Sequence, residues 1–508
     1  MKPLWKLDRT PPAGTPFDPG ARHEVIIVGA GLTGLTTAVM LTRAGLDVVV
    51  IEAGSVGELA SGGNTGKLTL LQGQRLAEIR RHHSADLVRA YVEANRDGMD
   101  WLVGFAEHAG IPFEQRTDHT YAQTPDGLGT VHEQHAAARE AGLATRVIAG
   151  GDLATPFPAV GAVALDGQVT IDPMLVAQAL ADEFLAAGGT LHTRIRVTGT
   201  HALPEPRVET TGGPMFADHI VIATGYPILD RGLYFSKMRA FRSYCVSFRF
   251  AGEVPASTFM SVDGPSRSIR PVSPADGPSV AQLIVGGNGH PVGRSDGEFA
   301  QVEDLVSWTH EHFPGAEETH RWSAQDYESH NQIPFVGAMP RGLGSIRFAT
   351  GYAKWGLSNA PAAALRLTAE ILGAHRTERP SWMTVLGTRL TVPADLARGA
   401  VEGAKVAAAA TTGWVKAESR PVPVPRPAEG EGVVANRGGL PVGISTVDGV
   451  TRAVDAVCPH LGGVLDWNDA ECTWDCPLHA SRFAADGTRI EGPALRDLKT
   501  LPRVVDED

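Results

Sequence analysis

The sequence predicts an α/β nucleotide-binding fold at the front of a chain that holds two or three domains. The chain has 508 residues, which is too long for one core of ordinary size. Residues 23–54 have the order strand, glycine turn, helix, strand that begins such a fold. Near the other end, residues 458–479 bring cysteines and histidines together at short spacings, which indicates a separate metal-binding region.

The first strand and turn carry a nucleotide fingerprint. The β-branched run at 25–28 leads into Gly29, and Gly29, Gly31 and Gly34 fit G-x-G-x-x-G. The first glycine allows a tight turn, the second lets the backbone approach a pyrophosphate, and the third lets helix and strand pack closely. Glu52 ends the next strand, where a carboxylate accepts ribose hydroxyls and disfavours a 2′-phosphate. The pattern predicts a site for FAD or NAD and argues against NADP.

Later segments favour FAD over NAD. A second fingerprint is not convincing at 283–293, because Pro291 and Gly293 stand where its helix should run. The stretch ADHIVIATGYPI at 217–228 is instead a strand that runs into a turn of small residues. FATGYAKWGLSNAPAAALRLTAEILG at 348–373 is a turn that leads into an Ala-rich helix. Both fit a flavin-binding half assembled from separated segments.

These residues carry a family resemblance. The chain from about 18 to 373 resembles the D-amino-acid-oxidase and glycine-oxidase superfamily of FAD-dependent oxidoreductases. The match rests on the fingerprint with Glu52 and on the segments ASGGNTGKLT (60–69), VALDGQVTIDP (163–173), IVIATG (220–225), RWSAQDYESHNQIPFVG (321–337) and GYAKWGLSNAP (351–361).

The resemblance implies how the front of the chain is organised. It predicts a Rossmann-like α/β FAD-binding domain interleaved with an antiparallel α+β substrate domain. The expected FAD domain comprises 18–75, 150–230 and 326–375, and the expected substrate domain 76–149 and 231–325. Within the latter, RSYCVSFRF and STFMSV alternate as strands do.

The resemblance also implies residues around the flavin. The Trp-Gly turn at 355–356 would place a helix N-terminus at the flavin pyrimidine, where its positive potential stabilises an anionic reduced ring. Trp355 is expected beside the flavin, and Lys67 is either a cation near the flavin ring or an exposed lysine. Arg242 either clamps a substrate carboxylate or lies on the surface, and His330 either faces the pocket or is structural. FAD is expected to be dissociable and to be bound by Gly29, Ala30, Gly31, Thr33, Gly34, Glu52, Thr65, Lys67, Val197, Ala223, Gly225, Gly351, Trp355, Gly356 and Leu357.

The tail holds a set of metal ligands. Cys458 and His460 form C-x-H, and Cys476 and His479 form C-x-x-H. Two thiolates and two imidazoles suit either a tetrahedral zinc or a Rieske [2Fe-2S] cluster, which has two cysteines on one iron and two histidines on the other. The surrounding CPHLGG, WDCPLHASRF and DGTRIEGPA resemble the all-β Rieske domain over 416–508, which favours the cluster. Cys472 is expected to be a small core residue.

The tail also departs from that resemblance. Gly463 and Leu478 stand where high-potential Rieske proteins have two further cysteines, so the disulfide of those proteins cannot form. Ser481 keeps an expected hydroxyl, but Phe483 replaces a tyrosine. Fewer hydrogen bonds would stabilise the reduced cluster less, so a potential in the lower or middle part of the roughly −150 to +300 mV Rieske range is expected. Ala480 replaces a usual glycine.

Composition and linkers set further limits. A formal net charge of −12 argues against a nucleic-acid binder. The most apolar run, 25–41, is broken by glycines, and the N-terminus lacks the apolar core of a signal peptide. The expectation is therefore a cytoplasmic protein without a membrane span. Residues 376–415 include an Ala-rich connecting helix, followed by a stiff Pro-rich segment at 420–432.

The pairing of cofactors predicts the function. A flavin takes two electrons from a substrate, whereas a Rieske cluster passes one at a time. The expectation is oxidation of a C–N bond in an amine, amino acid or related molecule, with electrons moving between FAD and the cluster and a protein or quinone as acceptor. One alternative is an electron-transfer or redox-sensing protein without such a substrate. Another is a Rieske oxygenase, but its 2-His-1-carboxylate iron site would need a carboxylate that the pairs His132/His135 and His310/His312 lack.

Overall fold

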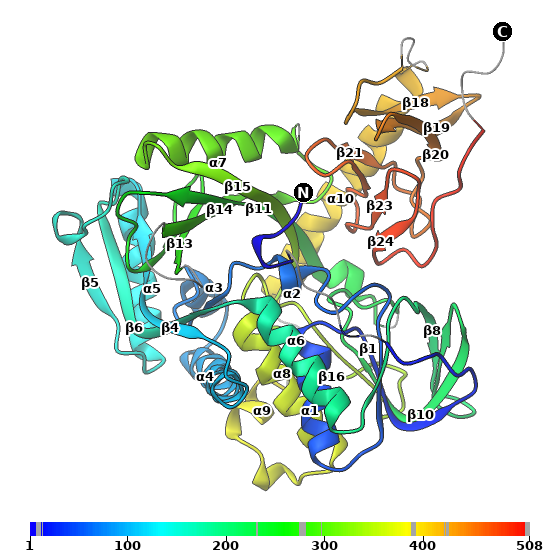
Figure 1. The fold of residues 1–508 in the computed structure, drawn as a ribbon, viewed down its shortest axis with the longest axis horizontal. Helices are drawn as coiled ribbons and strands as arrows, with labels where there is room; N and C mark the ends of the chain where they lie inside the picture. The colour runs from blue at the N-terminus through cyan, green and yellow to red at the C-terminus, as the bar shows by residue number, and fades with distance from the viewer. Residues whose placement is uncertain are drawn as a thin grey trace.

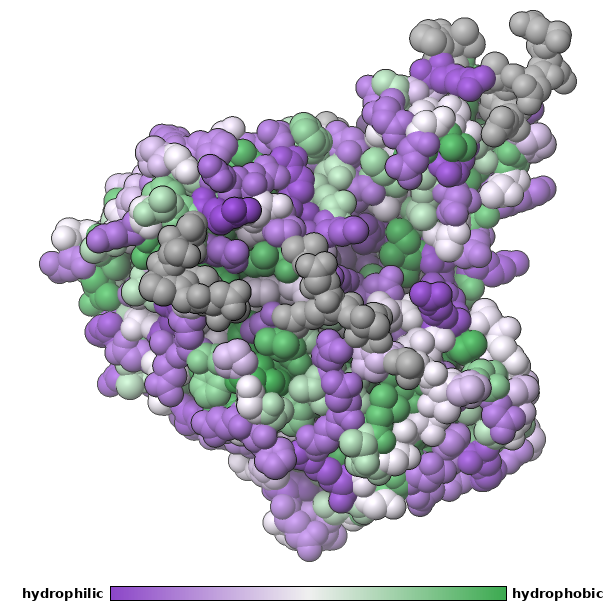
Figure 2. All heavy atoms as spheres, in the orientation of Figure 1, coloured by the Kyte–Doolittle hydropathy of each residue, from purple (hydrophilic) through white to green (hydrophobic). Residues whose placement is uncertain are grey.

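The computed structural model describes residues 1–6, 12, 14–229, 232–273, 281–295, 297–387, 393–420, 422 and 426–502. Two sheets with their helices form the body, and the C-terminal domain, orange and red in Figure 1, lies beside the end of the β11/β15 pair. Within the described residues, no helix combines the length and apolarity needed to span a bilayer. The surface is hollowed where the C-terminal domain meets the body (Figure 2).

The first sheet is the predicted α/β layer, with the strand order β16-β17-β10-β1-β2-β7. Strands β1, β2, β7, β10 and β17 pair in parallel. Such strands are buried on both faces: Val25 and Ile27 pack among the helices, and Ile26 and Val28 pack on the opposite side. The strands are β1 (Arg22–Val28), β2 (Val48–Ile51), β7 (Thr190–His192), β8 (Val197–His201), β9 (Arg207–Thr210), β10 (Gly213–Ile222), β16 (Phe335–Ala338) and β17 (Ile346–Thr350).

Helices of this layer come from distant parts of the chain. They contact one another in the pairs α1·α8, α1·α6, α4·α8 and α4·α9. Their bounds are α1 (Leu32–Arg43), α2 (Ala60–Gly63), α4 (Ala85–His108), α6 (Pro173–Ala186), α8 (Gly356–Ile371) and α9 (Ser381–Val385).

The second sheet has the order β15-β11-β14-β13-β12-β4-β6-β3, with β5 beside β6. Helix α7 covers β11 and β14, and α3 packs on α5. The strands are β3 (Lys67–Leu68), β4 (Phe113–Ala122), β5 (Arg146–Ala149), β6 (Gly161–Ile171), β11 (Met238–Phe250), β12 (Thr258–Ser261), β13 (Arg267–Val272), β14 (Ala281–Pro291) and β15 (Glu317–Ser329); the helices are α3 (Arg75–His82), α5 (Leu128–Glu140) and α7 (Glu298–His312).

This sheet corrects the predicted domain limits. Strands β3 and β6 lie in segments assigned to the FAD domain, yet both belong to the second sheet. β6 pairs along its whole length with β4, and β15 crosses the predicted limit at 326. Sheet membership is decided by the distant partner strand, which a local sequence pattern does not reveal.

The C-terminal domain is all-β, as predicted. Its sheets have the orders β18-β19-β20 and β21-β22-β23-β24, and every pairing in them is antiparallel. The strands are β18 (Gly432–Arg437), β19 (Leu440–Val447), β20 (Val450–Asp455), β21 (Asp466–Asn468), β22 (Thr473–Asp475), β23 (Arg482–Ala484) and β24 (Arg489–Glu491).

The connecting helix α10 (Pro393–Ser419) is longer than its predicted limit at 415. It contacts β18 and β19 of the C-terminal domain and the short helix η4 (Tyr234–Lys237) of the body, so it runs along the boundary between them (Figure 1). The Pro-rich segment after it lies partly outside the described residues.

Candidate active site and metal centre

The turn after β1 is shaped by its glycines. Gly29 has a φ of 107°, and a Cβ there would lie 2.6 Å from the carbonyl oxygen of Ala223. A Cβ on Gly34 would lie 1.9 Å from the carbonyl oxygen of Gly29, so only glycine lets α1 approach β1 this closely. Helix α1 begins at Leu32, whose amide donates to Oγ of Ser61 at 3.0 Å, and its N-cap Gly31 has no side chain to cap the other amides. A helix N-terminus at this point of the fold is of the kind that binds phosphates. This backbone fits the pyrophosphate of FAD.

Glu52 lies directly after β2, beside that turn. Its carboxylate accepts hydrogen bonds from the amides of Ala30 and Gly54, each at 2.7 Å. Burial raises the pKa of this carboxyl, while the two amide donors act in the opposite direction. A carboxylate at this point of the fold accepts ribose hydroxyls, so its placement also fits FAD.

Two later segments reach the same edge of the sheet. Gly225 follows β10, and its carbonyl oxygen accepts a hydrogen bond from the Thr350 hydroxyl. The Tyr352 hydroxyl lies 3.0 Å from Oγ1 of Thr33, which joins the turn before α8 to the start of α1. Because β1, β10 and β17 are parallel, their C-terminal ends meet at one edge. The predicted FAD residues on the segments at this edge are Gly29, Ala30, Gly31, Thr33, Gly34, Glu52, Ala223, Gly225, Gly351, Trp355, Gly356 and Leu357.

Three other predicted residues lie on separate segments. Val197 is buried at the start of β8, and the carbonyl oxygen of Thr65 accepts a hydrogen bond from Arg270. Lys67 is buried in β3, where its Nζ donates to Oγ of Ser268 at 2.7 Å and burial lowers its pKa. The Lys67 side chain is thus buried inside the second sheet, so the alternative of an exposed lysine is wrong, and its role beside the flavin ring stays a prediction.

A cavity of about 710 Å³ lies between the second sheet, α3, α10 and the turn before α8. Trp355 lines it, and His330 does so too. In its wall, the Glu328 carboxylate binds Arg75 at 2.7 Å and Arg239 at 2.6 Å. Burial alone would raise the pKa of Glu328, but the two arginines outweigh it and lower the pKa to about 2. The cavity has the size of a small-molecule site and adjoins the start of α8.

The four predicted cluster ligands gather at one end of the C-terminal domain. The Cys476 thiol donates a hydrogen bond to the Cys458 sulfur, which lowers the pKa of Cys458 to about 7 and raises that of Cys476. The rings of His460 and His479 lie 5.2 Å apart. Backbone amides of residues 460 and 461 point to the Cys458 sulfur, as do those of 478 and 479 to the Cys476 sulfur. Thiolates held by amides fit the sulfur side of a cluster.

This arrangement separates the two ligand types. The thiols lie together and the imidazoles lie together, which is the division between two irons in a Rieske centre. Among the described residues, no group of three or more histidines, cysteines or carboxylates is placed to hold a single metal ion. The separation of the thiols from the imidazoles therefore favours a two-iron cluster over one zinc.

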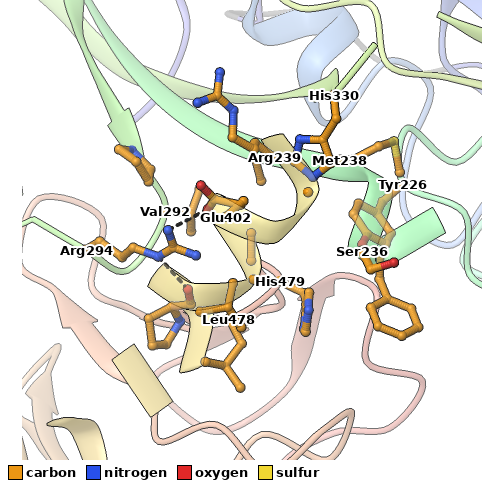
Figure 3. Close-up of a pocket in the computed structure, with 18 residues that line it drawn as sticks. Tyr226, Ser236, Met238, Arg239, Val292, Arg294, His330, Glu402, Leu478 and His479 are labelled. Atoms are coloured by element: carbon orange, nitrogen blue, oxygen red, sulfur yellow. Dashed lines mark hydrogen bonds and ion pairs between the residues drawn. The ribbon is translucent and has the colours of Figure 1, made fainter. Parts of the chain in front are cut away.

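The imidazole end of the centre faces the body. The Phe235 ring of η4 contacts the rings of His460 and His479 edge-on, at centroid distances of 5.3 and 5.0 Å. A cavity of about 90 Å³ separates this end from β11 and α10. Figure 3 shows His330 and His479 on opposite sides of it, with Arg294 bound to Glu402. Arg239, His330 and Glu402 line this cavity and the larger one.

Arg242 lies in the interface with the C-terminal domain. The side chain is fully buried and binds Glu471, with Asp475 3.5 Å away and Gln325 at 2.8 Å. Burial alone would lower the pKa of the Arg242 guanidinium, but the carboxylates of Asp475 and Glu471 outweigh burial and raise it. Neither predicted role fits this placement: Arg242 is not a surface residue, and its charge is satisfied by protein carboxylates rather than turned to the large cavity.

Tyr327 is a site residue that the sequence reasoning did not single out. Its hydroxyl donates to Glu491 of the C-terminal domain, and its carbonyl oxygen accepts from the amide of Ala353, in the turn before α8. A Cβ on Gly225 would lie 3.5 Å from its ring. The neighbouring Gln325 donates to the carbonyl oxygen of Ala480, next to His479, at 3.0 Å. One strand therefore joins the predicted FAD segments to a cluster-ligand loop.

Comparisons with known proteins give matches for both the FAD-binding body and the C-terminal domain. Residues 24–370 match the family model of FAD dependent oxidoreductases, and residues 421–502 match that of the Rieske [2Fe-2S] domain. The putative Rieske 2Fe-2S iron-sulfur protein YhfW of Bacillus subtilis (strain 168) is 28% identical over 501 residues, covering 98% of this chain and 97% of the relative.

Solved structures resemble the body of the molecule. The glycine oxidase of Geobacillus kaustophilus superposes with a TM-score of 0.61 at 21% identity, covering 73% of this chain and all of that one. The L-proline dehydrogenase of P. horikoshii gives a TM-score of 0.58 at 16% identity, covering 72% of this chain and 97% of that one. At these identities the likeness establishes the fold alone.

Proposed function

We propose a function from two premises: the chain belongs to the FAD-dependent oxidoreductase family and ends in a Rieske [2Fe-2S] domain. The protein is an oxidoreductase with FAD and a [2Fe-2S] cluster as its cofactors. In our proposal it oxidises a C–N bond of an amine, amino acid or related small molecule and passes the electrons from FAD to the cluster, then to a protein or quinone acceptor.

The observation that carries this proposal is the contact made by β15. Tyr327 holds the turn before α8 through its carbonyl oxygen and the C-terminal domain through its hydroxyl. Gln325, two residues earlier, holds the loop that contains His479. A redox-active domain with an unrelated role would not need its ligand loop fixed against the flavin-binding segments.

The residues divide the work between the two cofactors. When bound, FAD would accept an electron pair from a substrate and the cluster would carry single electrons, which would divide a two-electron oxidation into one-electron steps. Glu52 and the N-terminus of α1 would hold FAD. Cys458, His460, Cys476 and His479 would hold the cluster, and Phe235 covers the imidazole end.

The large cavity supports a small-molecule substrate. Its volume of about 710 Å³ suits an organic molecule, and a protein that only relays electrons has no use for such a space. The glycine oxidase and the L-proline dehydrogenase that share the fold act on amino acids by their names, which is why we propose an amine or amino acid here.

Anaerobic reduction of the wild type and of His479→Cys tests the proposal. A panel of amines and amino acids is mixed with each protein, and bleaching of the flavin absorbance is followed. We expect equal flavin reduction in both, because that step is local to the cavity, and loss of turnover with an external one-electron acceptor in the variant. His132→Cys, an exposed change on α5, is the control.

Two results would count against it. Turnover that survives in His479→Cys would show that the cluster is not the exit for electrons. A flavin that no panel member bleaches, but that a reduced partner protein bleaches, would favour the electron-transfer alternative.

A further inference from the structure

Most charges in the wall of the large cavity already have partners inside the protein. The pairs are Glu328 with Arg75 and Arg239, Glu402 with Arg294, and Arg81 with Glu133. These groups hold the wall together, and their charges are largely cancelled before any ligand enters.

Asp326 and Lys354 are different. Asp326 lies on β15 and Lys354 in the turn before α8, and both line the cavity. Among the described residues, neither side chain has a hydrogen-bond or ion-pair partner within contact distance. Of the charges that act on Asp326, Lys354 has the largest effect. The cavity thus has a carboxylate on β15 and an ammonium group before α8 in its wall, and the two are close enough to influence each other electrostatically.

The surroundings give these two charges room and an apolar frame. A Cβ on Gly289 would lie 2.9 Å from Nζ of Lys354, so the absence of a side chain there makes space for the ammonium group. Asp326 pairs with Phe241 in the β11–β15 register, and Phe241, Met260 and Trp355 line the same cavity. Trp355 is also the N-cap residue of α8, where the flavin ring is expected.

We propose that Asp326 binds the ammonium group of the substrate and takes one proton from it, and that Lys354 binds an anionic group of the same molecule. In this step an N–H bond of the ammonium breaks, its electron pair stays on nitrogen, and the proton forms an O–H bond with the Asp326 carboxylate. The nitrogen lone pair then forms the C=N bond as the neighbouring C–H leaves as hydride. The inference rests on the proposed function, in which the substrate carbon is oxidised and FAD is reduced.

The charges around Asp326 suit a base. Burial raises its pKa to about 6, with Glu328 adding to the rise and Lys354, Arg75 and Arg239 opposing it. The carboxylate is therefore charged above about pH 6 and neutral below it. A base whose pKa lies near the working pH transfers protons most effectively. Cation binding to this site should accordingly weaken as the pH falls through about 6.

Binding of simple ions to the FAD-loaded protein tests the assignment without turnover. The probes are tetramethylammonium, which has no N–H proton to lose, and acetate, and binding is read from the visible spectrum of the flavin. At pH 7.5 we expect Asp326→Asn to weaken tetramethylammonium binding by about tenfold or more and to leave acetate binding unchanged. Lys354→Met should do the reverse. Asp86→Asn, on the exposed start of α4, is the control.

The outcomes separate this inference from the proposed function. Unchanged tetramethylammonium binding in Asp326→Asn, or no response of the wild-type spectrum to either probe, would overturn the assignment. Asp326→Glu keeps the charge and should keep a pH-dependent affinity; an affinity independent of pH in this variant and in the wild type would overturn it as well. If the ions bind as expected but no amine bleaches the flavin, the charge assignment stands and amine oxidation fails.

Discussion

The two cofactor sites of this molecule are built in opposite ways. The four cluster ligands come from two short loops inside one small domain, between residues 458 and 479. Most of the predicted FAD residues come from segments that follow β1, β2, β10 and β17, and they meet only because those strands are parallel neighbours. A local site can be read from the spacing of its ligands, whereas a distributed site depends on the pairing of strands far apart in sequence.

The contact between the two regions differs from both sites. It is built from buried charges, with Arg242 of β11 and Arg482 of β23 both bound to Glu471. Such a network is costly to break from one side, because the groups left behind stay buried and charged. We therefore expect that either cofactor can be lost alone, while the interface is sensitive to a single substitution.

The largest effect is expected at the local site. Cys476→Ser removes one thiolate of the pair and should abolish the cluster while FAD remains bound. Metal and sulfide analysis should give two irons and two acid-labile sulfides per wild-type chain and close to none in the variant. Cys472→Ser, at a half-buried cysteine outside the ligand pair, should keep both. One zinc per wild-type chain would contradict the assignment.

Arg242→Met should be the most damaging change at the interface. It leaves Glu471 and Asp475 buried without one of their cations, which costs about 3–5 kcal/mol. Denaturant unfolding measures this loss, and Arg89→Met, in an exposed pair with Asp86, should cost far less. A loss below about 1 kcal/mol would mean that the interface charges are not a structural connection.

The same network should be sensitive to acid. Burial would raise the pKa of Glu471, but Arg482 and Arg242 outweigh it and lower the pKa from 4.5 to about 2. A depressed carboxyl pKa stabilises the folded state fully above the unfolded value and loses that contribution as pH falls toward the folded value. The difference in stability between wild type and Arg242→Met should therefore narrow between about pH 4.5 and 2.

At the distributed site the expected effect is smaller and leaves the cluster intact. Glu52→Arg removes the acceptor that Ala30 and Gly54 now hold and puts a cation in its place. FAD affinity should fall on the order of a hundredfold, about 3 kcal/mol, with the iron content unchanged. Flavin release during gel filtration measures the loss. Equal flavin occupancy in wild type and variant would remove Glu52 from the site.

The smallest expected effect is a gain in the stability of the C-terminal domain. Ala480, beside His479, has a φ of 64°, a left-handed conformation that glycine adopts without strain. Ala480→Gly should stabilise the C-terminal domain by about 1 kcal/mol. Ala485→Gly, at a buried alanine outside this conformation, should destabilise it. A loss of stability in Ala480→Gly would show that the lost methyl contacts outweigh the strain.

The sequence predicts those parts of the molecule that depend only on residues close together in the chain. The fingerprint glycines, Glu52 and the two ligand pairs follow from spacing, because the chemistry of a turn or a metal loop fixes those residues. The strand alternation in DYES could also have placed Asp326 and Glu328 on one face. What that face meets could not be predicted, since the cavity is closed by α3 and α10 from other parts of the chain.

Arg242 shows the limit of that reasoning most clearly. A buried arginine on a strand of the substrate sheet suits a carboxylate ligand, and the sequence does not say whether that carboxylate belongs to a substrate or to the protein. Here it belongs to Glu471, more than two hundred residues away. Such an ion pair depends on how whole domains pack against each other, and the sequence near Arg242 does not predict it.

Electron transfer from flavin to cluster is the central claim, and freeze-quench reduction tests it most directly. The wild-type protein is mixed anaerobically with an amine that bleaches its flavin, and the electron paramagnetic resonance signal of the reduced cluster is followed beside the flavin absorbance. We expect the cluster signal to rise after the flavin bleaches, and to rise more slowly in Tyr327→Phe, which loses the hydroxyl contact to Glu491. A flavin that is fully reduced beside a cluster that stays oxidised would contradict it.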